Sequence, residues 1–460
     1  FLCLRIHRRS RLSEGIKKEE KENMKKLSTH IREHLPAYLL ATLALVIHVG
    51  LDMLSPELTK RIIDDVIGNG NLAALKGILL GFFAIGIGRF IFGYIKEYTF
   101  DVTGATIASN MRKELFDHIQ SLSADFFDRT GTGELMSRIK DDIDHIWDGI
   151  SYVGMLLIEV AVHTSLILFC MIRINWKLAL IPIVCMILCA CLAIYLEKKL
   201  DSVYEAISEE NAELNTVAEE NLTGVRTVRA FAREDFEINK FLSHNTRYYE
   251  LNMQQSKIFV KYHPLFSLVS KILPLFVLLF GGILYLNQRD GSFTLGDLGA
   301  FIQYSTNIVW PMEMLGWLTN SLSSAVASNK KIRKLYAETP TIKNPENPVV
   351  LPGVKGKLSF SHVSFVREEK PVLSDISFTV EAGHTLGIMG ATGSGKSSIV
   401  QLMQRMYDCS DGSISLDDVD IRELTLKQVR SSISAVMQDV FLFSDTIDEN
   451  VRLGKKDSIT

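Results

Sequence analysis

Residues 386–398, "LGIMGATGSGKSS", combine glycines, a lysine and hydroxyls at a spacing that suits phosphate binding. They fit the pattern G-x-x-x-x-G-K-[ST], in which glycines let backbone N–H groups close around phosphates. We expect Lys396 to reach the β- and γ-phosphates of a nucleotide, and the Ser397 hydroxyl to ligate Mg²⁺. The predicted nucleotide-binding loop comprises Gly390, Ala391, Thr392, Gly393, Ser394, Gly395, Lys396, Ser397 and Ser398.

This loop needs a strand before it and a helix after it. The β-rich run 385–389 predicts the strand, and the run 397–407 predicts a helix whose N-terminus adds a partial positive charge. Further β-rich runs at 357–365 and 375–380 indicate an α/β domain over 357–460. In such folds the strand that bears the loop lies in the middle of a mostly parallel sheet. Residues 338–356 carry four prolines and predict an extended linker.

The part of the chain before the linker has a different composition. Hydrophobic residues make up 47% of the chain and the mean hydropathy is +0.15, which points away from a simple cytosolic enzyme. A bilayer-crossing helix needs about 20 mostly apolar residues. We predict six such spans, at 38–54, 77–95, 152–172, 176–196, 264–286 and 295–322. The net charge of −3 implies no bulk attraction to nucleic acid, so no nucleic-acid partner is expected.

The links between spans alternate in length. Those within each successive pair are short, whereas 96–150 and 197–262 are long and charged. Both long links carry helical stripes and predict helices that extend well beyond the bilayer: Met111, Leu115, Ile119 and Leu122 in the first, Leu214, Ala218, Leu222 and Val225 in the second. An even number of spans places both chain ends on one side, which we expect to be cytoplasmic because ATP is cytosolic.

Several ionisable residues interrupt the apolar runs. A charge at the bilayer centre costs about 2.5–3.5 kcal/mol on insertion scales, so such residues face a water-filled cavity or pair with one another. Two interpretations stay open here: structural pairs, for example Asp52 with Arg89, or contacts to a transported substrate. The candidates are His48, Asp52, Arg89, Glu159, His163, Lys271 and Glu313, with Trp310 and Trp317 as cavity walls or interface anchors.

The cysteines and the N-terminal segment give little information about function. The chain has six cysteines without a CxxC pair, and four lie in apolar runs, so neither a metal nor a redox role is expected. Residues 1–35 form a basic N-terminal segment that starts with Phe1. Two hypotheses stand for residues 1–23: a translated leader before a start at Met24, or an ordinary disordered tail.

Over residues 24–460 the chain resembles an ABC exporter half-transporter of the bacterial multidrug or lipid type. The resemblance rests on "FFDRTGTGELMSRIKDDIDHI" and "ENLTGVRTVRAFARE" in the long links, "GSFTLGDLGAFIQY" at the sixth span, the phosphate loop, and the stretch ending near Gln438. It implies a membrane α-helical fold: a six-helix transmembrane domain at 36–337 with long cytoplasmic helical extensions, then a partial α/β P-loop ATP-binding cassette.

The resemblance also implies roles. Gln438 would contact Mg²⁺ and the attacking water as a catalytic residue, and short coupling helices near 123–128 and 222–227 would seat on the cassettes. Two half-transporters, identical or different, would export amphipathic small molecules, drugs or lipids across a bacterial plasma membrane by alternating access. Membrane lipids, ATP and Mg²⁺ are the other implied partners and cofactors.

The chain departs from the family pattern at several positions. Arg367 stands where an aromatic residue normally stacks on adenine, so Phe365 or the Arg367 guanidinium is expected to take that role. Met437 replaces a usual proline, and Asp418 a usual turn glycine. The sequence stops at Thr460 without the signature motif, the catalytic glutamate or the switch histidine. From this we expect a fragment that binds nucleotide weakly and does not turn it over.

The sequence is compatible with two interpretations other than an exporter. The same parts could form a non-transporting ATP-regulated membrane protein, an ATP-gated channel, or a degenerate subunit of a heterodimer. A soluble P-loop kinase fused to membrane spans has little support, because the motifs on both sides of the linker belong to one family.

Overall fold

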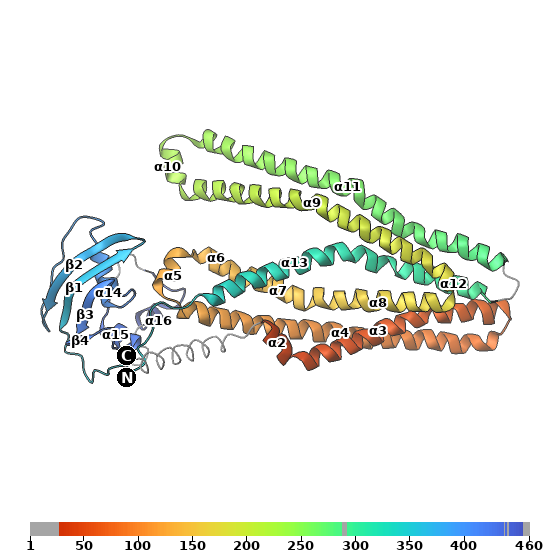
Figure 1. Cartoon of the computed structure of the whole chain (residues 1–460), viewed down its shortest axis with the longest axis horizontal. Helices are drawn as coiled ribbons and strands as arrows, with labels where there is room; N and C mark the ends of the chain where they lie inside the picture. The colour runs from red at the N-terminus through yellow and green to blue at the C-terminus, as the bar shows by residue number, and fades with distance from the viewer. Residues whose placement is uncertain (1–26, 288–291, 437, 439–440, 454–460) are drawn as a thin grey trace, which may run out of the picture. The chain divides into compact units, whose positions relative to one another are not determined.

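The computed structural model describes residues 27–287, 292–436, 438 and 441–453 (Figure 1). The chain divides into two compact units, one formed by residues 1–111 and 141–331 and the other by 112–140 and 332–460. We call them the helical unit and the sheet unit. The N-terminal leader hypothesis, Met437 and residues after 453 lie outside the described residues.

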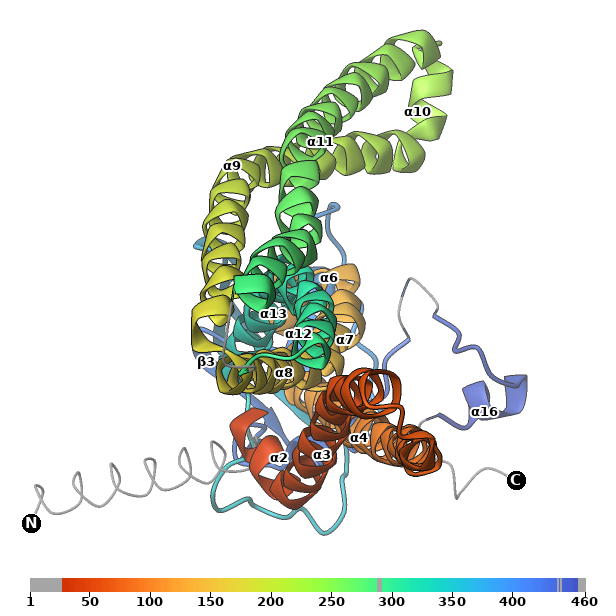
Figure 2. The ribbon, with the colours of Figure 1, turned by 90° about the vertical axis from the view of Figure 1, so that its right-hand side faces the viewer.

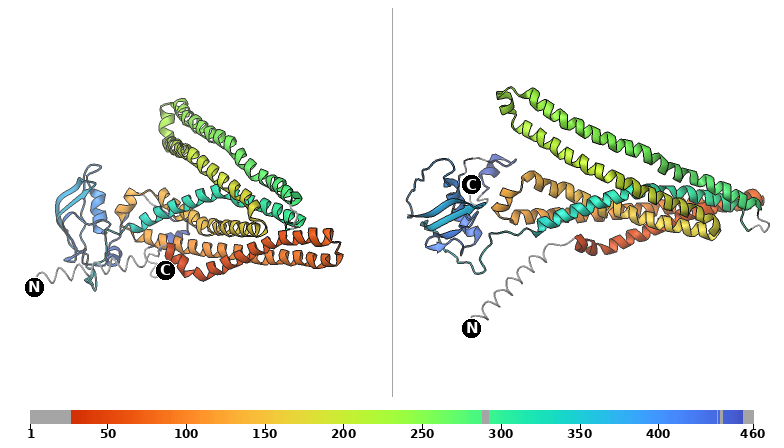
Figure 3. Two further views of the ribbon diagram at one scale, coloured as in Figure 1. Left: turned by 45° about the vertical axis from the view of Figure 1, so that its right-hand side comes forward. Right: turned by 45° about the horizontal axis from the view of Figure 1, so that its top comes forward.

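The helical unit consists of long helices joined by short links. After α2 (Leu27–Glu33) the chain forms α3 (Leu35–Arg61), the π-helix η1 (Ile62–Gly68) and α4 (Leu72–Ser121). Then come α7 (Ile143–Ile150), α8 (Tyr152–Ile174), α9 (Trp176–Thr223), α10 (Val225–Ala230) and α11 (Glu234–Asn287). α9 and α11 lie side by side, with α10 joining their far ends (Figures 2 and 3). The unit closes with α12 (Leu295–Asn307) and α13 (Val309–Ala337).

Among the residues that the structure describes, five helical segments are long and apolar enough to cross a membrane. They contain the first five predicted spans. α4, α9 and α11 have 50, 48 and 54 residues. At 1.5 Å per residue such a helix is roughly 75 Å long, against about 30 Å for the bilayer core. The prediction that the long links continue the spans as helices is therefore confirmed.

The sixth predicted span, at 295–322, is not one continuous helix. It is divided at Ile308 into α12 and α13. The physical reason lies at Pro311, because a proline ring clashes with the carbonyl four residues earlier, and that residue is Asn307, the last of α12.

The two predicted apolar stripes have different outcomes. Met111, Leu115, Ile119 and Leu122 are all buried, so the first stripe faces a core as expected. In the second stripe Leu222 is 77% exposed and Val225 is also exposed, so that stripe has little cover within this chain. The main core of the helical unit gathers side chains from α8, α9, α11 and α12, among them Ile167, Met171, Leu273 and Phe301.

The sheet unit begins with the end of α4 and continues with α5 (Ala124–Arg129), α6 (Thr132–Ser137) and the start of the π-helix η2 (Arg138–Asp142). Its sheet has the order β2-β1-β3-β4 and is antiparallel: β1 (Leu358–Arg367), β2 (Lys370–Val380), β3 (Asp411–Leu416) and β4 (Val419–Asp420). The helices α14 (Lys396–Met403), α15 (Leu426–Ser432) and α16 (Ile447–Val451) complete it. The apolar core includes Phe360, Val363, Ile399, Leu402 and Val429.

The predicted β-rich runs at 357–365 and 375–380 form β1 and β2, but the predicted strand at 385–389 is wrong. That segment has no regular structure and is exposed, with Met389 at 96%. A strand exists only when a neighbour accepts and donates its ladder hydrogen bonds. In the described part of the chain none of the four strands pairs with this segment. The following helix also ends at Met403, earlier than the predicted 407.

The turn between β3 and β4 explains why glycine suits position 418. Asp417 and Asp418 have φ values of +52° and +65°, which a residue with a side chain rarely adopts. A two-residue hairpin turn of type I′ needs positive φ at both central positions. Asp417 in return accepts backbone N–H groups from Lys355, Gly356 and Lys357, which ties the end of the linker to the sheet.

Candidate functional site

The predicted phosphate loop forms a glycine-rich turn that leads into α14. Gly393 and Gly395 have φ values of +84° and +87°, a region that glycine enters without a steric penalty. Gly395 is the N-cap of α14. The first N–H groups of α14, from Lys396 onward, have no acceptor within the helix and belong to its positive end. The loop residues 391–394 are exposed. This arrangement can hold an anion such as a nucleotide phosphate.

Lys396 folds back over the loop. Its ammonium group donates to the carbonyl oxygens of Gly390, at 2.9 Å, and Ala391, at 2.7 Å. The Ser394 hydroxyl lies 3.4 Å away. The cation is therefore held at the open side of the loop. Phosphate oxygens can replace these neutral carbonyl acceptors, since charge-assisted hydrogen bonds are the stronger ones.

The loop packs closely on β2. A Cβ atom at Gly395 would lie 2.6 Å from the Leu373 side chain and 3.0 Å from the Val372 carbonyl oxygen. Leu373 pairs in register with Phe365 of β1. The loop, β2 and β1 thus form one contiguous stack, and a side chain at position 395 would push the loop away from the sheet.

Phe365 and Arg367, the two predicted adenine contacts, have different surroundings. Phe365 is 5% exposed and packs on Tyr407, with ring centroids 5.7 Å apart, so its faces are covered in this structure. The Arg367 side chain is 41% exposed. Its guanidinium lies 5.4 Å from the centre of the Tyr407 ring. Of the two, Arg367 offers the more accessible planar group.

Arg367 also contacts α5, the segment predicted as the first coupling helix. Its guanidinium forms an ion pair of 2.7 Å with the Asp128 carboxylate, and the Tyr407 hydroxyl donates to the same oxygen at 2.6 Å. We call Asp128, Arg367 and Tyr407 the α5 clasp. Burial, together with the nearby negative charge of Asp128, raises the pKa of Tyr407 to about 12. The hydroxyl is therefore a proton donor at neutral pH.

Two further hydrogen bonds hold the start of α5. The Ser123 hydroxyl accepts from the Ile342 backbone N–H at 3.0 Å, and Asp125 accepts from the Thr341 hydroxyl at 2.9 Å. Both partners belong to the linker. Sequence reasoning expected a contact from 123–128 but did not single out Asp128 or Tyr407, since only the folded chain brings positions 279 residues apart together.

Gln438, the predicted catalytic and metal-contacting residue, is exposed and outside the helices and strands. It lies beyond α15 in the chain, between residues that the structure leaves undescribed. Its role, like those of Ser397 and the other loop residues, stays a prediction.

The ionisable residues of the first spans form pairs. Arg89 contacts the Asp52 carboxylate at 2.5 Å, and His163 lies 3.4 Å from its other oxygen. His48 contacts the carbonyl oxygen of Arg89 at 2.9 Å. The Asp52–Arg89 pair is the one named from the sequence, and that structural pairing is confirmed. The same side chains remain candidates for substrate contact.

A second pair includes a residue that sequence reasoning missed. Glu159 binds the buried ammonium of Lys96 at 2.6 Å. Lys96 follows the second predicted span directly, and that position at a helix exit was its only signal. His163 also meets Trp310 edge to face at 6.1 Å, and Trp317 meets Tyr152 at 5.8 Å. Lys271 and Glu313 are exposed and do not join either pair.

Comparison with known proteins shows which family this chain resembles. A family model described as "ABC transporter transmembrane region" matches residues 38–312, and one described as "ABC transporter" matches residues 373–459. The chain is 32% identical to the "Uncharacterized ABC transporter ATP-binding protein YwjA" of Bacillus subtilis, over 88% of this chain and 70% of that protein. It is 28% identical to the "Putative multidrug export ATP-binding/permease protein YgaD" of the same organism, over 95% and 76%. It is also 28% identical to the "ATP-dependent lipid A-core flippase" of Desulfotalea psychrophila, over 96% and 76%.

Proposed function

Since the chain belongs to the ABC transporters as a multi-pass membrane protein of exporter type, we propose that it moves amphipathic small molecules, drugs or lipids outward by alternating access. The observation that carries the proposal is the pairing in one chain of membrane-length helices with a glycine loop built for phosphate. Relatives named as a multidrug exporter and a lipid flippase support the substrate class.

The loop residues fit ATP with Mg²⁺. The glycines at positive φ, the leading N–H groups of α14 and the Lys396 ammonium would bind the phosphates, and Ser397 would hold the metal with Gln438. Mg²⁺ supplies charge neutralisation between the β- and γ-phosphates when bound. Arg367 would lie against the base. Phosphate binding would draw Lys396 away from the Gly390 and Ala391 carbonyls that it contacts now.

The driving force has to come from differential binding. Moving a two-state equilibrium from 1:99 to 99:1 needs about 5.5 kcal/mol of preference for one state. A nucleotide enclosed between two cassettes can supply this preference, because its contacts to the second cassette exist only in the closed state. The α5 clasp would carry the movement from the sheet unit toward the spans.

We further propose that two such chains, identical or different, form the transporter in the bacterial plasma membrane with the sheet units in the cytoplasm. The tip of the α9–α11 hairpin supports a partner, since Leu222 and Phe231 are 77% and 75% exposed there. The paired charges around Asp52 and Glu159, with Lys271, Trp310 and Glu313, would line the substrate path.

The test is transport by the native protein in sealed vesicles, with an amphipathic dye and a fluorescent lipid as the two probes. We expect Lys396→Ala to lower ATP-driven movement at least about 100-fold, because the phosphates lose their principal cation. Lys427→Ala, which removes an ammonium from α15, is the matched control and should transport normally. Equal transport by Lys396→Ala and wild type would refute the proposal. ATP binding without movement of either probe would favour a non-transporting regulator instead.

A further inference from the structure

A cluster of polar contacts joins the first membrane hairpin to the start of α12, far along the chain. The Asp64 carboxylate accepts the Thr294 hydroxyl at 2.6 Å through one oxygen and the Gly296 backbone N–H at 2.8 Å through the other. Lys60 forms an ion pair of 2.8 Å with Asp297. These residues are more than 225 positions apart in sequence, so the contacts join two separate hairpins.

Asp64 completes the N-terminus of α12 from outside the helix. Within α12, Thr294 and Asp297 form a capping box. The Gly296 N–H belongs to the first turn and has no acceptor within the helix. Asp64 supplies that acceptor and places a negative charge at the positive end of the helix. The Thr294 hydroxyl carries one hydrogen, and its contact to Asp64, at 2.6 Å, is shorter than the one to Asp297, at 3.1 Å.

Two glycines allow this close approach. A Cβ atom at Gly296 would lie 2.5 Å from an Asp64 oxygen and 2.6 Å from the Lys60 carbonyl oxygen. At Gly299, one turn later, it would lie 2.6 Å from the Ile63 side chain. Opposite these glycines the chain forms the π-helix η1, a rare geometry that occurs frequently at functional sites. The surfaces of η1 and α12 are therefore complementary in shape.

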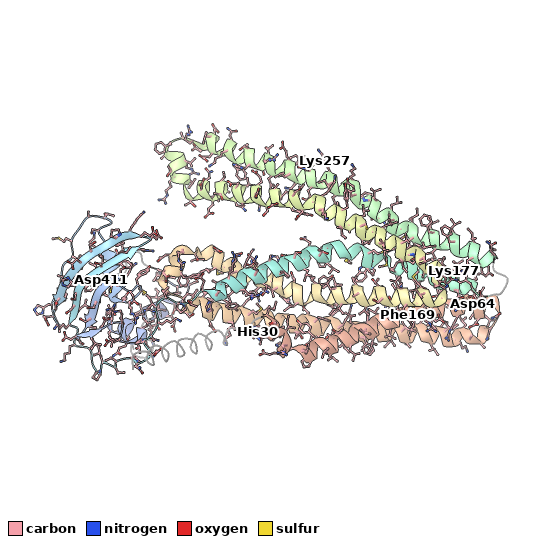
Figure 4. All side chains as sticks on the ribbon, in the orientation of Figure 1. His30, Asp64, Phe169, Lys177, Lys257 and Asp411 are labelled. Carbon is pink, nitrogen blue, oxygen red and sulfur yellow. The ribbon has the colours of Figure 1, made fainter. Side chains whose placement is uncertain are left out.

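The contacts lie at the end of the helical unit that carries the short links. Figure 4 shows Asp64 at the same end as Lys177, which follows the short link between α8 and α9. In the proposed topology this end faces the outside. Farther along α12 the Tyr304 hydroxyl donates to the Met53 carbonyl at 2.8 Å, so α3 and α12 are also joined deeper in the bundle.

We propose that Asp64, with Lys60, Thr294, Gly296 and Asp297, forms an outer latch that keeps the external end of the transport path closed until the nucleotide-driven change opens it. These carboxylate hydrogen bonds and the ion pair are part-buried, and such polar groups can exchange their partners for water, whereas an interdigitated apolar core cannot. The latch rests on the proposed function, because its opening is assigned to the transport cycle.

The experiment measures the separation of the outer ends directly. Spin labels are attached to Leu72→Cys in α4 and Leu286→Cys in α11, in a background whose native cysteines are replaced. Both positions are exposed and lie outside the latch. The native protein is studied in lipid nanodiscs by double electron–electron resonance, diluted with unlabelled chains so that only distances within one chain are seen.

Without nucleotide we expect Asp64→Asn to raise the ratio of long to short distances about tenfold, as for the loss of hydrogen bonds to a charged acceptor. Gly296→Ala should do the same from the other side of the contact. Asp65→Asn in the same π-helix and Gly282→Ala, with open space around its Cβ, are the matched controls and should resemble wild type. Thr294→Ser keeps the hydroxyl and should also resemble wild type. Size-exclusion profiles confirm that each variant is folded.

The possible outcomes distinguish failure of the latch proposal from failure of the proposed exporter function. Wild-type distances in both Asp64→Asn and Gly296→Ala, together with an ATP-induced lengthening in wild type, would overturn the latch and leave the exporter standing. A longer distance in Asp64→Asn without any ATP response in wild type would support the latch as a closing contact and contradict its assignment to an ATP-driven cycle.

Discussion

At the scale of single residues, Asp128 stands out because two donors from different parts of the sheet unit meet on one of its oxygens. Arg367 comes from the end of β1 and Tyr407 from the segment after α14. The phosphate loop touches β2, and β2 pairs with β1, so a continuous set of contacts leads from Gly395 to α5. The clasp can therefore report the state of the loop to the helix that follows α4.

We predict that Asp128→Asn lowers the stability of α5 against local opening by about 0.5–1 kcal/mol. Its contacts are partly exposed, and solvent screens such pairs strongly. Amide hydrogen exchange over 124–129 should become several-fold faster, and adding Tyr407→Phe should cost less than in wild type because the shared acceptor is already weakened. Glu346→Gln in the linker is the control. Strictly additive effects of the two changes would argue against a shared contact.

The raised pKa of Tyr407 gives a prediction for alkaline pH. A group whose pKa is raised by folding contributes stability that is complete below its unfolded pKa, about 10, and is lost as the pH rises through the folded value. The Tyr407–Asp128 contact should thus persist to about pH 10 and disappear near 12. Difference absorbance of tyrosinate between wild type and Tyr407→Phe measures this titration. In Asp128→Asn the same step should shift to lower pH, and an unshifted step would count against the assigned cause.

At the scale of elements, the phosphate loop depends on glycine at position 395. Gly395→Ala would place a side chain against Leu373 and force a left-handed backbone that costs about 1–2 kcal/mol for other residues. We predict nucleotide affinity at least about tenfold weaker, measured by titration calorimetry with ATP and Mg²⁺. Gly387→Ala has open space around its Cβ and is the matched control. Normal affinity in Gly395→Ala would show that the loop does not bind phosphate in this geometry.

The paired charges between α3 and α4 lead to a second element-scale prediction. Arg89→Met leaves the Asp52 carboxylate with His163 and without its strongest partner, which should cost about 1–3 kcal/mol. The thermal unfolding midpoint of the detergent-solubilised protein should fall, and Asp52→Asn added to Arg89→Met should recover most of the loss. Lys271→Met, which removes an exposed ammonium from α11, should change the midpoint little. A double variant less stable than Arg89→Met would contradict structural pairing.

Local pattern predicted much of this architecture. The apolar runs form helices, the Met111–Leu122 stripe is buried as its periodicity indicates, and the β-rich runs at 357–365 and 375–380 form β1 and β2. The prediction of a strand at 385–389 was wrong because strand formation depends on a neighbouring strand, which sequence periodicity does not identify. Pro311 divides the sixth predicted span. A hydropathy window does not include the effect of a proline on the residue four positions earlier. The α5 clasp and the Lys96–Glu159 pair depend on long-range packing, and their partners could not be identified from the local sequence.

At the scale of the whole molecule, the helical unit and the sheet unit would contribute different physical properties to one proposed transport cycle. The sheet unit offers glycine conformations and a cation for a triphosphate, and the helical unit offers helices of 48 to 54 residues that can carry displacement over a long distance. Short polar contacts join separate elements: Asp52 and Asp64 link helices, and Asp128 links α5 to the end of β1. Rigid elements with exchangeable joints are what a two-state machine requires.

The most direct measurement is nucleotide-dependent amide hydrogen exchange of the native protein in lipid nanodiscs, followed in α3 and α12 with and without ATP and Mg²⁺. We predict that ATP changes exchange at the Lys60–Asp64 and Thr294–Asp297 segments in wild type and in Lys427→Ala, and that Lys396→Ala abolishes the change. Unaltered exchange in the wild-type membrane helices at saturating ATP, or an identical response in Lys396→Ala, would contradict the proposal that nucleotide held by the phosphate loop rearranges the lipid-embedded helices.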